Sequence, residues 1–307
     1  MIHLYQSILS FLVAVSISLL LMVSPIFAAT SQSIPSPEKL YFQEGVALFN
    51  DGNYSVAVEA FSKAIQENEN YSAAYGNRCL SYIELQNYPS AIADCTTAIA
   101  LTPNNTEAYL NRGLAHYRLG EYATAIADFT QLLQIKPHDH RAHYNRGLAY
   151  VEQGQYREAI VDYGEALRQV SPLDAASLTL IYNDQGVAYL MLGQDRAAIA
   201  ALTEAIHYHA SDARALFNRG CAYHRLGNET AALEDFSQVT VIDPDYAQAY
   251  LNRGLIQHQL GEQDKAIADL RQAAQHFLSQ GNVTAHRQTL DLLQKIQASP
   301  STLQDIA

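Results

Sequence analysis

The sequence repeats itself at a fixed spacing, and this feature constrains the fold more than any other. Segments 109–137, 143–167 and 250–275 share the tripeptide Asn-Arg-Gly, followed by the pattern Ala-Ile-x-Asp. Alignment on the glycine of the tripeptide gives seven anchor residues, which lie 34 residues apart except for one interval of 39: Gly45, Cys79, Gly113, Gly147, Gly186, Gly220 and Gly254. A period of this length predicts a repeat protein in which each unit packs against its neighbours.

Each unit predicts two short helices. Apolar residues around the anchor have helical spacing, and seven residues later a glycine, or Gln86 in the second unit, predicts the end of the first helix. An amphipathic second helix follows, and Pro103, Pro137 and Pro244 close three of the units. An alanine twelve residues after every anchor predicts close helix packing: Ala57, Ala91, Ala125, Ala159, Ala198, Ala232 and Ala266.

The period and the pattern Gly…Tyr…Gly-x-Tyr…Ala…Phe…Pro make this chain similar to the tetratricopeptide repeat (TPR) superfamily. The resemblance covers residues 38–280 in seven copies. It implies an all-α fold, a right-handed TPR α-solenoid of helix-turn-helix repeats that forms one extended domain. An apolar stripe predicts a C-terminal capping helix over 281–298, followed by a flexible tail over 299–307.

The N-terminal segment 1–28 predicts export. Residues 8–27 are almost wholly apolar, and Ala28 is a small residue suited to a cleavage site. The first basic residue is Lys39, and the apolar run is nearly long enough to span a bilayer. A cleaved signal peptide and an uncleaved membrane anchor therefore both fit, with residues 29–37 as a linker. Either reading predicts a periplasmic, lumenal or extracellular chain, with membrane association through this segment in the second.

Arginine and aspartate vary together among the repeats. Five repeats have arginine immediately before the anchor and aspartate fifteen residues after it, and the first and fifth repeats lack both. Such covariation predicts a contact between the two helices of a repeat. The alternative is that the arginines bind an anionic ligand. The pairs are Arg78 with Asp94, Arg112 with Asp128, Arg146 with Asp162, Arg219 with Asp235, and Arg253 with Asp269.

The second and fifth repeats depart from the pattern. Cys79 replaces the anchor glycine, and Cys95 replaces the aromatic residue or leucine found sixteen residues after the anchor elsewhere. In an exported chain these two cysteines are candidates for a structural disulfide, and compensating core packing is the alternative. The 39-residue interval predicts a seam near 168–182, either a longer helix or a bend, unless it is a tolerated surface insertion.

The sequence offers no catalytic site and no cofactor site. Motifs such as GxSxG, HExxH, the P-loop and GxGxxG do not occur, and the repeats occupy most of the chain. The net charge of −12 argues against a nucleic-acid partner. The best metal candidate is the turn with His138, Asp139, His140 and His143, but a fourth ligand is not evident, so we assign no metal site.

Protein or peptide segments are the expected partners. The resemblance implies that the first helix of each repeat lines a groove, and asparagine recurs there two residues before the anchor, at Asn77, Asn111, Asn145, Asn218 and Asn252. A row of side-chain amides could bind an extended peptide backbone, or could only stabilise the solenoid. Thirteen of the 20 tyrosines fall at three repeated packing positions, and among the other seven the groove candidates are Tyr144 and, second to it, Tyr117.

The sequence as a whole predicts a non-enzymatic scaffold or adaptor that binds protein segments, in the assembly or organisation of membrane-associated or envelope complexes. Two alternatives remain from other classes. One is a periplasmic protein that binds a metal or a small ligand at the histidine-rich turn, and the other is an auxiliary subunit of an enzyme on another chain.

Overall fold

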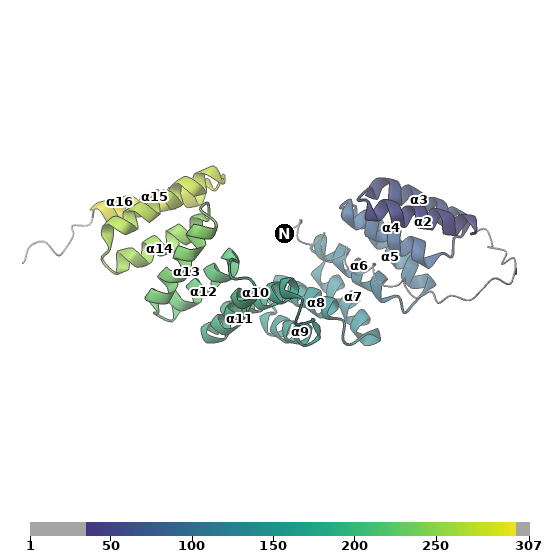
Figure 1. Cartoon of the computed structure of the whole chain (residues 1–307), viewed down its shortest axis with the longest axis horizontal. Coiled ribbons are helices and arrows are strands. Elements are labelled where there is room, and N and C mark those ends of the chain that lie inside the picture. Colours follow the sequence, from purple (N-terminus) through teal and green to yellow (C-terminus); the bar gives the residue numbers. More distant parts are fainter. Residues whose placement is uncertain (1–34, 299–307) are drawn as a thin grey trace, which may run out of the picture. The chain divides into compact units, whose positions relative to one another are not determined.

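The computed structural model describes residues 35–298, which form helices in consecutive antiparallel pairs (Figure 1). The segment 1–28, most of the linker and the tail 299–307 lie outside the described residues. The helices are α2 (Pro37–Asn50), α3 (Tyr54–Glu67), α4 (Ser72–Glu84), α5 (Tyr88–Leu101), α6 (Thr106–Arg118), α7 (Tyr122–Ile135), α8 (His140–Glu152), α9 (Tyr156–Gln169), α10 (Ala175–Met191), α11 (Asp195–Tyr208), α12 (Ala213–Arg225), α13 (Glu229–Ile242), α14 (Ala247–Gln259), α15 (Gln263–Ser279) and α16 (Val283–Ala298). The predicted all-α class is confirmed.

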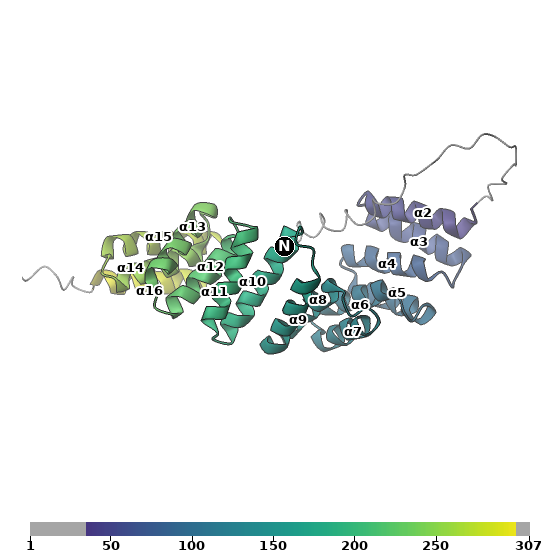
Figure 2. The same cartoon turned by 60° about the horizontal axis from the view of Figure 1, so that its bottom comes forward.

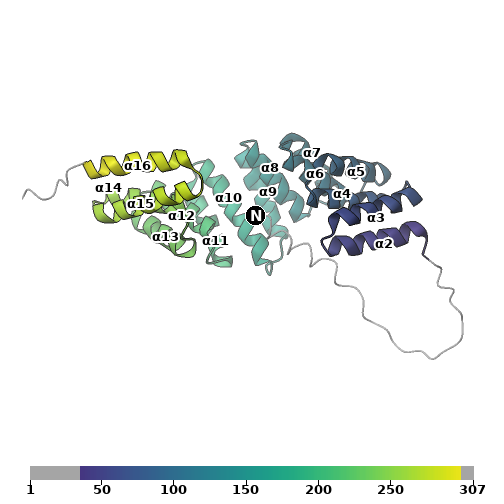
Figure 3. The same ribbon diagram turned by 90° about the horizontal axis from the view of Figure 1, so that it is seen from above.

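The contacts divide the described residues into two compact units, 35–128 and 129–298. In the first unit, α2 to α5 lie in chain order as successive layers (Figure 2). In the second unit, α8 to α15 continue as pairs, and α16 packs against α15 as the predicted capping helix (Figure 3). We call α2, α4, α6, α8, α10, α12 and α14 the first helices. Their partners α3, α5, α7, α9, α11, α13 and α15 are the second helices.

The first helices end as the sequence predicts. The glycine seven residues after the anchor has a positive φ in six repeats, between 72° and 79°. Glycine adopts this left-handed conformation without a steric penalty. Gln86 has the same conformation, with a φ of 59°, although it carries a side chain. The second repeat therefore keeps the geometry of the turn although it has glutamine in place of glycine.

The anchor glycines allow the two helices of a repeat to approach closely. A Cβ atom at Gly45 would lie 2.6 Å from the ring of Phe61, and one at Gly147 would lie 2.6 Å from the ring of Tyr163. At Gly186 the distance to the Leu202 side chain would be 2.5 Å. The residue sixteen positions after the anchor therefore occupies the space that a side chain at the anchor would need, which confirms the predicted close packing.

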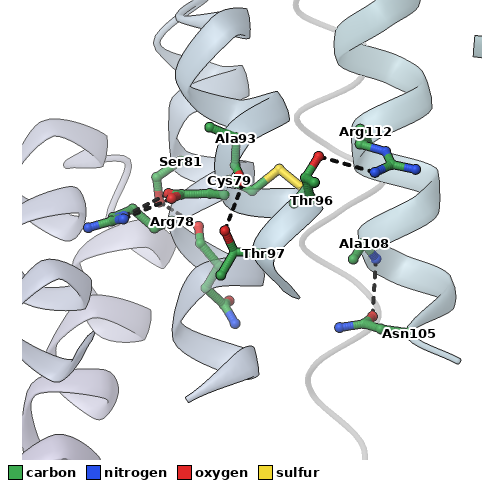
Figure 4. The surroundings of a disulfide bond; sticks show 12 residues. Arg78, Cys79, Ser81, Ala93, Thr96, Thr97, Asn105, Ala108 and Arg112 are labelled. Atoms are coloured by element: carbon green, nitrogen blue, oxygen red, sulfur yellow. Dashed lines mark hydrogen bonds and ion pairs between the residues drawn. A yellow bond between two sulfur atoms is a disulfide. The ribbon is translucent and has the colours of Figure 1, made fainter. Parts of the chain in front are cut away.

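The second repeat replaces this contact by a covalent bond (Figure 4). Cys79 on α4 and Cys95 on α5 form a disulfide, with their Cα atoms 5.5 Å apart. Both residues are fully buried. One cysteine stands at the anchor and the other at the position of the bulky residue, so the same pair of sites that packs glycine against a ring elsewhere is cross-linked here.

The predicted arginine–aspartate pairs are confirmed in all five repeats. In each, Nε and Nη2 of the arginine donate to the two carboxylate oxygens of the aspartate over 2.7–3.0 Å, a bidentate geometry. The arginine also lies over a tyrosine ring of its own helix, with its Cζ atom 5.4–5.9 Å from the ring centre. The aspartates are buried, so these ion pairs join the two helices of a repeat from inside.

The same arginines also connect neighbouring repeats, which the sequence analysis did not predict. The Nη1 atom of each donates to a hydroxyl on the second helix of the preceding repeat, over 2.8–3.2 Å. The acceptors are Ser62, Thr96, Thr130, Thr203 and Ser237, each seventeen residues after its own anchor. We call the arginine, its aspartate and this hydroxyl residue the arginine link.

The fifth repeat has no arginine link to the fourth. Gln185 stands in place of the arginine, Ala201 in place of the aspartate and Gly164 in place of the hydroxyl residue. The extra residues of the 39-residue interval lengthen α10 to 17 residues, compared with 13 in α8 and α12. Leu178 and Ile181 of α10 pack with Tyr163 of α9 in an apolar cluster. Apolar contacts therefore replace the arginine link at this junction, beside a hydrogen bond from Nε2 of Gln185 to the carbonyl of Ile160 over 3.5 Å and one from Tyr144 on α8 to Asp184 on α10.

Candidate functional site

The first helices form a continuous row within each unit. Helix α4 contacts both α2 and α6 in the first unit, and α10 contacts both α8 and α12 in the second. The residue two positions before the anchor falls on this row in every repeat, and we call it the ladder position. It carries Gln43, Asn77, Asn111, Asn145, Asp184, Asn218 and Asn252.

The ladder asparagines have different surroundings. Nδ2 of Asn77 donates to the carbonyl of Ala73 over 2.8 Å, and Nδ2 of Asn145 donates to the carbonyl of Arg141 over 2.7 Å. Each bond is to the residue four positions earlier in the same helix. Asn111 and Asn145 are buried, with exposed fractions of 8% and 7%, while Asn77 is partly exposed. The structure therefore leaves Asn77 more accessible than the other two.

In the second unit a chain of hydrogen bonds runs across three first helices. Nδ2 of Asn218 on α12 donates to Oδ1 of Asn183 on α10 over 3.3 Å. Nδ2 of Asn183 donates to Oδ1 of Asp184 over 3.2 Å. From α8, the hydroxyl of Tyr144 donates to Oδ2 of Asp184 over 2.8 Å. The structure thus joins Tyr144 to Asp184 directly and Asn218 to Asp184 through Asn183, and both Tyr144 and Asn218 are predicted groove residues.

Asn183 and Asp184 were not predicted as site residues. Asn183 stands where five repeats carry Phe42, Leu110, Tyr144, Phe217 or Leu251 and the second carries Gly76, and Asp184 stands where five repeats carry asparagine. Both departures were visible in the comparison of the repeats. They occur in the repeat that also lacks the arginine link, so the fifth repeat differs on its groove residues as well as in its packing.

The Asp184 carboxylate has an unusual electrostatic environment. Burial raises the pKa of Asp184, and the hydrogen bond from Tyr144 and the charge of Arg214 lower it only in part, so that the pKa stays above its ordinary value. Asp212 contributes to the rise through its own charge. Arg214 pairs with Asp212, with 3.5 Å between Nη2 and Oδ2. The two hydrogen bonds that Asp184 accepts come from neutral groups, the Tyr144 hydroxyl and the Asn183 amide.

The row continues toward the seventh repeat through Cys221 and Asn252. Nδ2 of Asn252 lies 3.6 Å from Sγ of Cys221, within the range of a hydrogen bond to sulfur. Burial raises the pKa of the Cys221 thiol to about 11, with a small opposing effect of Asn252. The thiol is therefore protonated at neutral pH and a poor nucleophile.

Two side chains of the histidine-rich turn, those of His143 and Asp139, are bonded within the fold. Nδ1 of His143 lies 3.0 Å from Oδ1 of Asp162, and Nε2 lies 3.0 Å from the carbonyl of Pro137. Burial lowers the pKa of His143, but these two hydrogen bonds outweigh it and raise the pKa overall. Asp139 caps α8 and binds Lys136 and Arg141. Among residues 35–298, no three His, Cys, Asp or Glu side chains are placed to share a metal ion.

Sequence models described as "Tetratricopeptide repeat" match five stretches of the chain: 42–106, 80–143, 140–169, 183–247 and 247–275. The chain belongs to the tetratricopeptide repeat superfamily. The matched stretches together span nearly all of the helix pairs described above, and the family supports a role as a scaffold for protein–protein interaction. No protein of curated function matches the chain.

Solved TPR structures share this fold. The crystal structure of MamA is 25% identical over 55% of this chain and 96% of its own, with a TM-score of 0.51. YrrB, described as a TPR protein with an unusual peptide-binding site, is 23% identical over 62% of this chain and 96% of its own, with a TM-score of 0.55. A TPR protein from Parabacteroides merdae is 20% identical over 85% of this chain and 100% of its own, with a TM-score of 0.60.

The fold and the family agree on a TPR solenoid. Within the part of the chain that the structure describes, none of the helices is long and apolar enough to cross a membrane.

Proposed function

We propose that this TPR protein is a non-enzymatic scaffold that binds extended protein segments along its first helices. The observation that carries the proposal is the polar row on the first helices, in which the ladder residues Asn218 and Asp184, joined through Asn183 and bonded to Tyr144, connect three successive first helices of the second unit. Side-chain amides offer both a donor and an acceptor, which matches the alternating groups of a peptide backbone. YrrB, with its peptide-binding site, gives a precedent within the fold.

Selection of peptides tests this function. Random peptides displayed on phage are panned against the full chain, and the selected peptides are then titrated by fluorescence anisotropy. The double variant Asn218→Ala, Asn252→Ala is expected to weaken their binding by about tenfold, the effect of one or two hydrogen bonds. Gln238→Ala is the matched control, because Gln238 is exposed on the second helix α13. If no peptide is selected, or if the double variant binds every peptide normally, the proposed function is wrong.

We also propose that the chain works in an exported, oxidising compartment, in the organisation of envelope or membrane-associated complexes. Two features support this setting: the apolar run of residues 8–27 and the disulfide between Cys79 and Cys95. Structural disulfides persist in oxidising compartments and are rare where thiols are kept reduced. Peptide mapping without reductant, on protein from its own cells, tests the proposal. Free thiols at both positions would contradict it.

A further inference from the structure

We propose that Asp184 is a specificity residue that binds a basic side chain, lysine or arginine, of the protein segment held along the first helices. This inference rests on the proposed function and adds to it the chemical class of one ligand residue. Its starting point is a substitution within the ladder: five repeats have asparagine at this position, and the fifth has aspartate. An asparagine can bind any peptide backbone, whereas a carboxylate selects for positive charge.

The hydrogen bonds around Asp184 leave room for a ligand. A carboxylate has about four lone-pair positions. The Tyr144 hydroxyl uses one on Oδ2, and the Asn183 amide uses one on Oδ1. Both donors are neutral, and they hold the carboxylate in place from α8 and from its own helix. The side chain is partly exposed, so an ammonium or guanidinium group can reach the remaining positions.

The environment makes a cationic ligand favourable. Burial raises the pKa of the carboxylate, and its two hydrogen-bond donors, Tyr144 and Asn183, are neutral, so among the described residues its negative charge has no direct ion-pair partner. A cation that binds there replaces lost solvation by a charge-assisted hydrogen bond. The overall charge of −12 acts in the same direction, because it draws basic segments toward the protein.

Arg214 is the internal competitor for this carboxylate. Its charge lowers the pKa of Asp184, but its guanidinium pairs with Asp212. Asp212 in turn accepts hydrogen bonds from the backbone N–H groups of Arg214 and Ala215, at the start of α12. Because Asp212 caps α12, it stays close to Arg214 and pairs with its guanidinium. A ligand cation at Asp184 therefore competes only with a guanidinium that already has a carboxylate partner.

The variant Asp184→Asn tests the inference because it restores the residue of the other ladder positions. It keeps an acceptor for the Tyr144 hydroxyl and removes the charge, while the oxygen that accepts from Asn183 becomes an amide N–H donor. Peptides are selected from a random phage library against the full chain and against this variant. We expect lysine or arginine to be enriched at one position of the wild-type pool, and this enrichment to be lost in the variant pool.

Matched synthetic peptides then measure the effect. In the best wild-type binder the basic residue is replaced by norleucine, which keeps the alkyl chain and removes the charge. This change is expected to weaken binding to the wild type by about tenfold, and to have little effect on the Asp184→Asn variant. Arg214→Gln is expected to strengthen binding of the basic peptide, because it removes the competing cation.

The outcomes separate this inference from the proposed function. If the wild type selects peptides without basic enrichment, or if norleucine weakens binding equally in both proteins, Asp184 does not select the ligand, although the groove binds peptides. If neither protein selects any peptide, the proposed function fails and this inference fails with it.

Discussion

The second and fifth repeats show two ways to build the same helix pair. In the second repeat, α4 and α5 are joined by a disulfide and by the bidentate pair of Arg78 with Asp94. In the fifth, α10 and α11 have neither, and Gly186 packs against the Leu202 side chain. The ladder residue differs too, since Asn77 bonds to its own helix while Asp184 joins a network across three helices.

This difference separates residues that stabilise the repeat from residues that are available for binding. The polar groups of the second repeat are used within the fold, and its link to the first repeat runs through Ser62. The fifth repeat loses the link and keeps a carboxylate whose ionised form is destabilised by burial. Groups that cost stability are retained more often at functional sites than elsewhere. The fifth repeat is therefore the better place to look for ligand specificity.

The largest expected effect concerns the arginine link itself. Arg78→Met keeps the alkyl packing and leaves Asp94, whose side chain is 9% exposed, without its cation. Removal of one partner of a buried ion pair costs about 3–5 kcal/mol. Gln185→Met at the matching position of the fifth repeat is expected to cost less than about 1 kcal/mol. Urea unfolding followed by circular dichroism measures both.

A double variant serves as the control for this prediction. Arg78→Met with Asp94→Leu replaces both partners by apolar residues, and should recover most of the stability lost in the single variant. Since repeats can unfold locally, hydrogen exchange of α4 and α5 shows whether the loss is confined to them. Equal costs for Arg78→Met and Gln185→Met would remove the distinction between the two repeats.

The next largest effect comes from the disulfide. Its cysteines are 16 residues apart, and a loop of this length corresponds to about 3 kcal/mol of stabilisation in the chain-entropy account. We therefore expect a reductant to lower the midpoint of urea unfolding of the wild type. The double variant Cys79→Gly, Cys95→Phe copies the pair Gly45 and Phe61 of the first repeat. It should be insensitive to reductant and at least as stable as the reduced wild type.

A reductant effect of equal size on this double variant would show that the cross-link is not the cause. Cys221→Ser is a further control, because the third cysteine lies outside the disulfide.

The third prediction restores the arginine link where it is missing. The triple variant Gln185→Arg, Ala201→Asp, Gly164→Thr is expected to stabilise the junction of the fourth and fifth repeats by about 1–2 kcal/mol, the range of hydrogen bonds to charged groups. A Cβ atom at Gly164 meets nothing closer than 4.0 Å, so the backbone there accepts a side chain without a clash at Cβ. Ala201→Asp alone should destabilise, because Ala201 is only 6% exposed and the carboxylate would be unpaired. Thermal unfolding compares the two, and a triple variant no more stable than Ala201→Asp would show that the link cannot form in this repeat.

The sequence allowed the prediction of those contacts that recur in several repeats. Arg112 and Asp128 were paired because five repeats carry both residues and two carry neither. The partner of Arg112 on the preceding repeat, Thr96, was missed, although the same comparison contains the signal: the one glycine in that column, Gly164, precedes the repeat with Gln185.

Single departures from the pattern could be seen in the sequence but not interpreted. The two readings of Cys79 and Cys95 differ only in the direction of their Cβ atoms, which depends on how α4 and α5 pack. Asp184 had no second example within the chain, and its role depends on Tyr144, which lies 40 residues away and meets it only after α8 and α10 pack. Covariation within one chain therefore predicts repeated contacts, whereas unique ones require the structure.

The smallest effect tests the binding side of the comparison through pH. Because the pKa of Asp184 is raised on folding, the folded chain binds more protons than the unfolded chain between the two pKa values, and stability falls as the pH rises through that window. Asp184→Asn removes this titration. The variant should be more stable than the wild type at neutral pH, by less than about 1 kcal/mol, and equally stable below about pH 3, where the carboxyl is protonated in both states. Thermal unfolding between these limits, with the exposed Asp291→Asn on α16 as control, measures the difference. A variant that is less stable at neutral pH would mean that Asp184 is stabilised by Arg214, so that the carboxylate belongs to the fold, like Asp94, and is not held for a ligand.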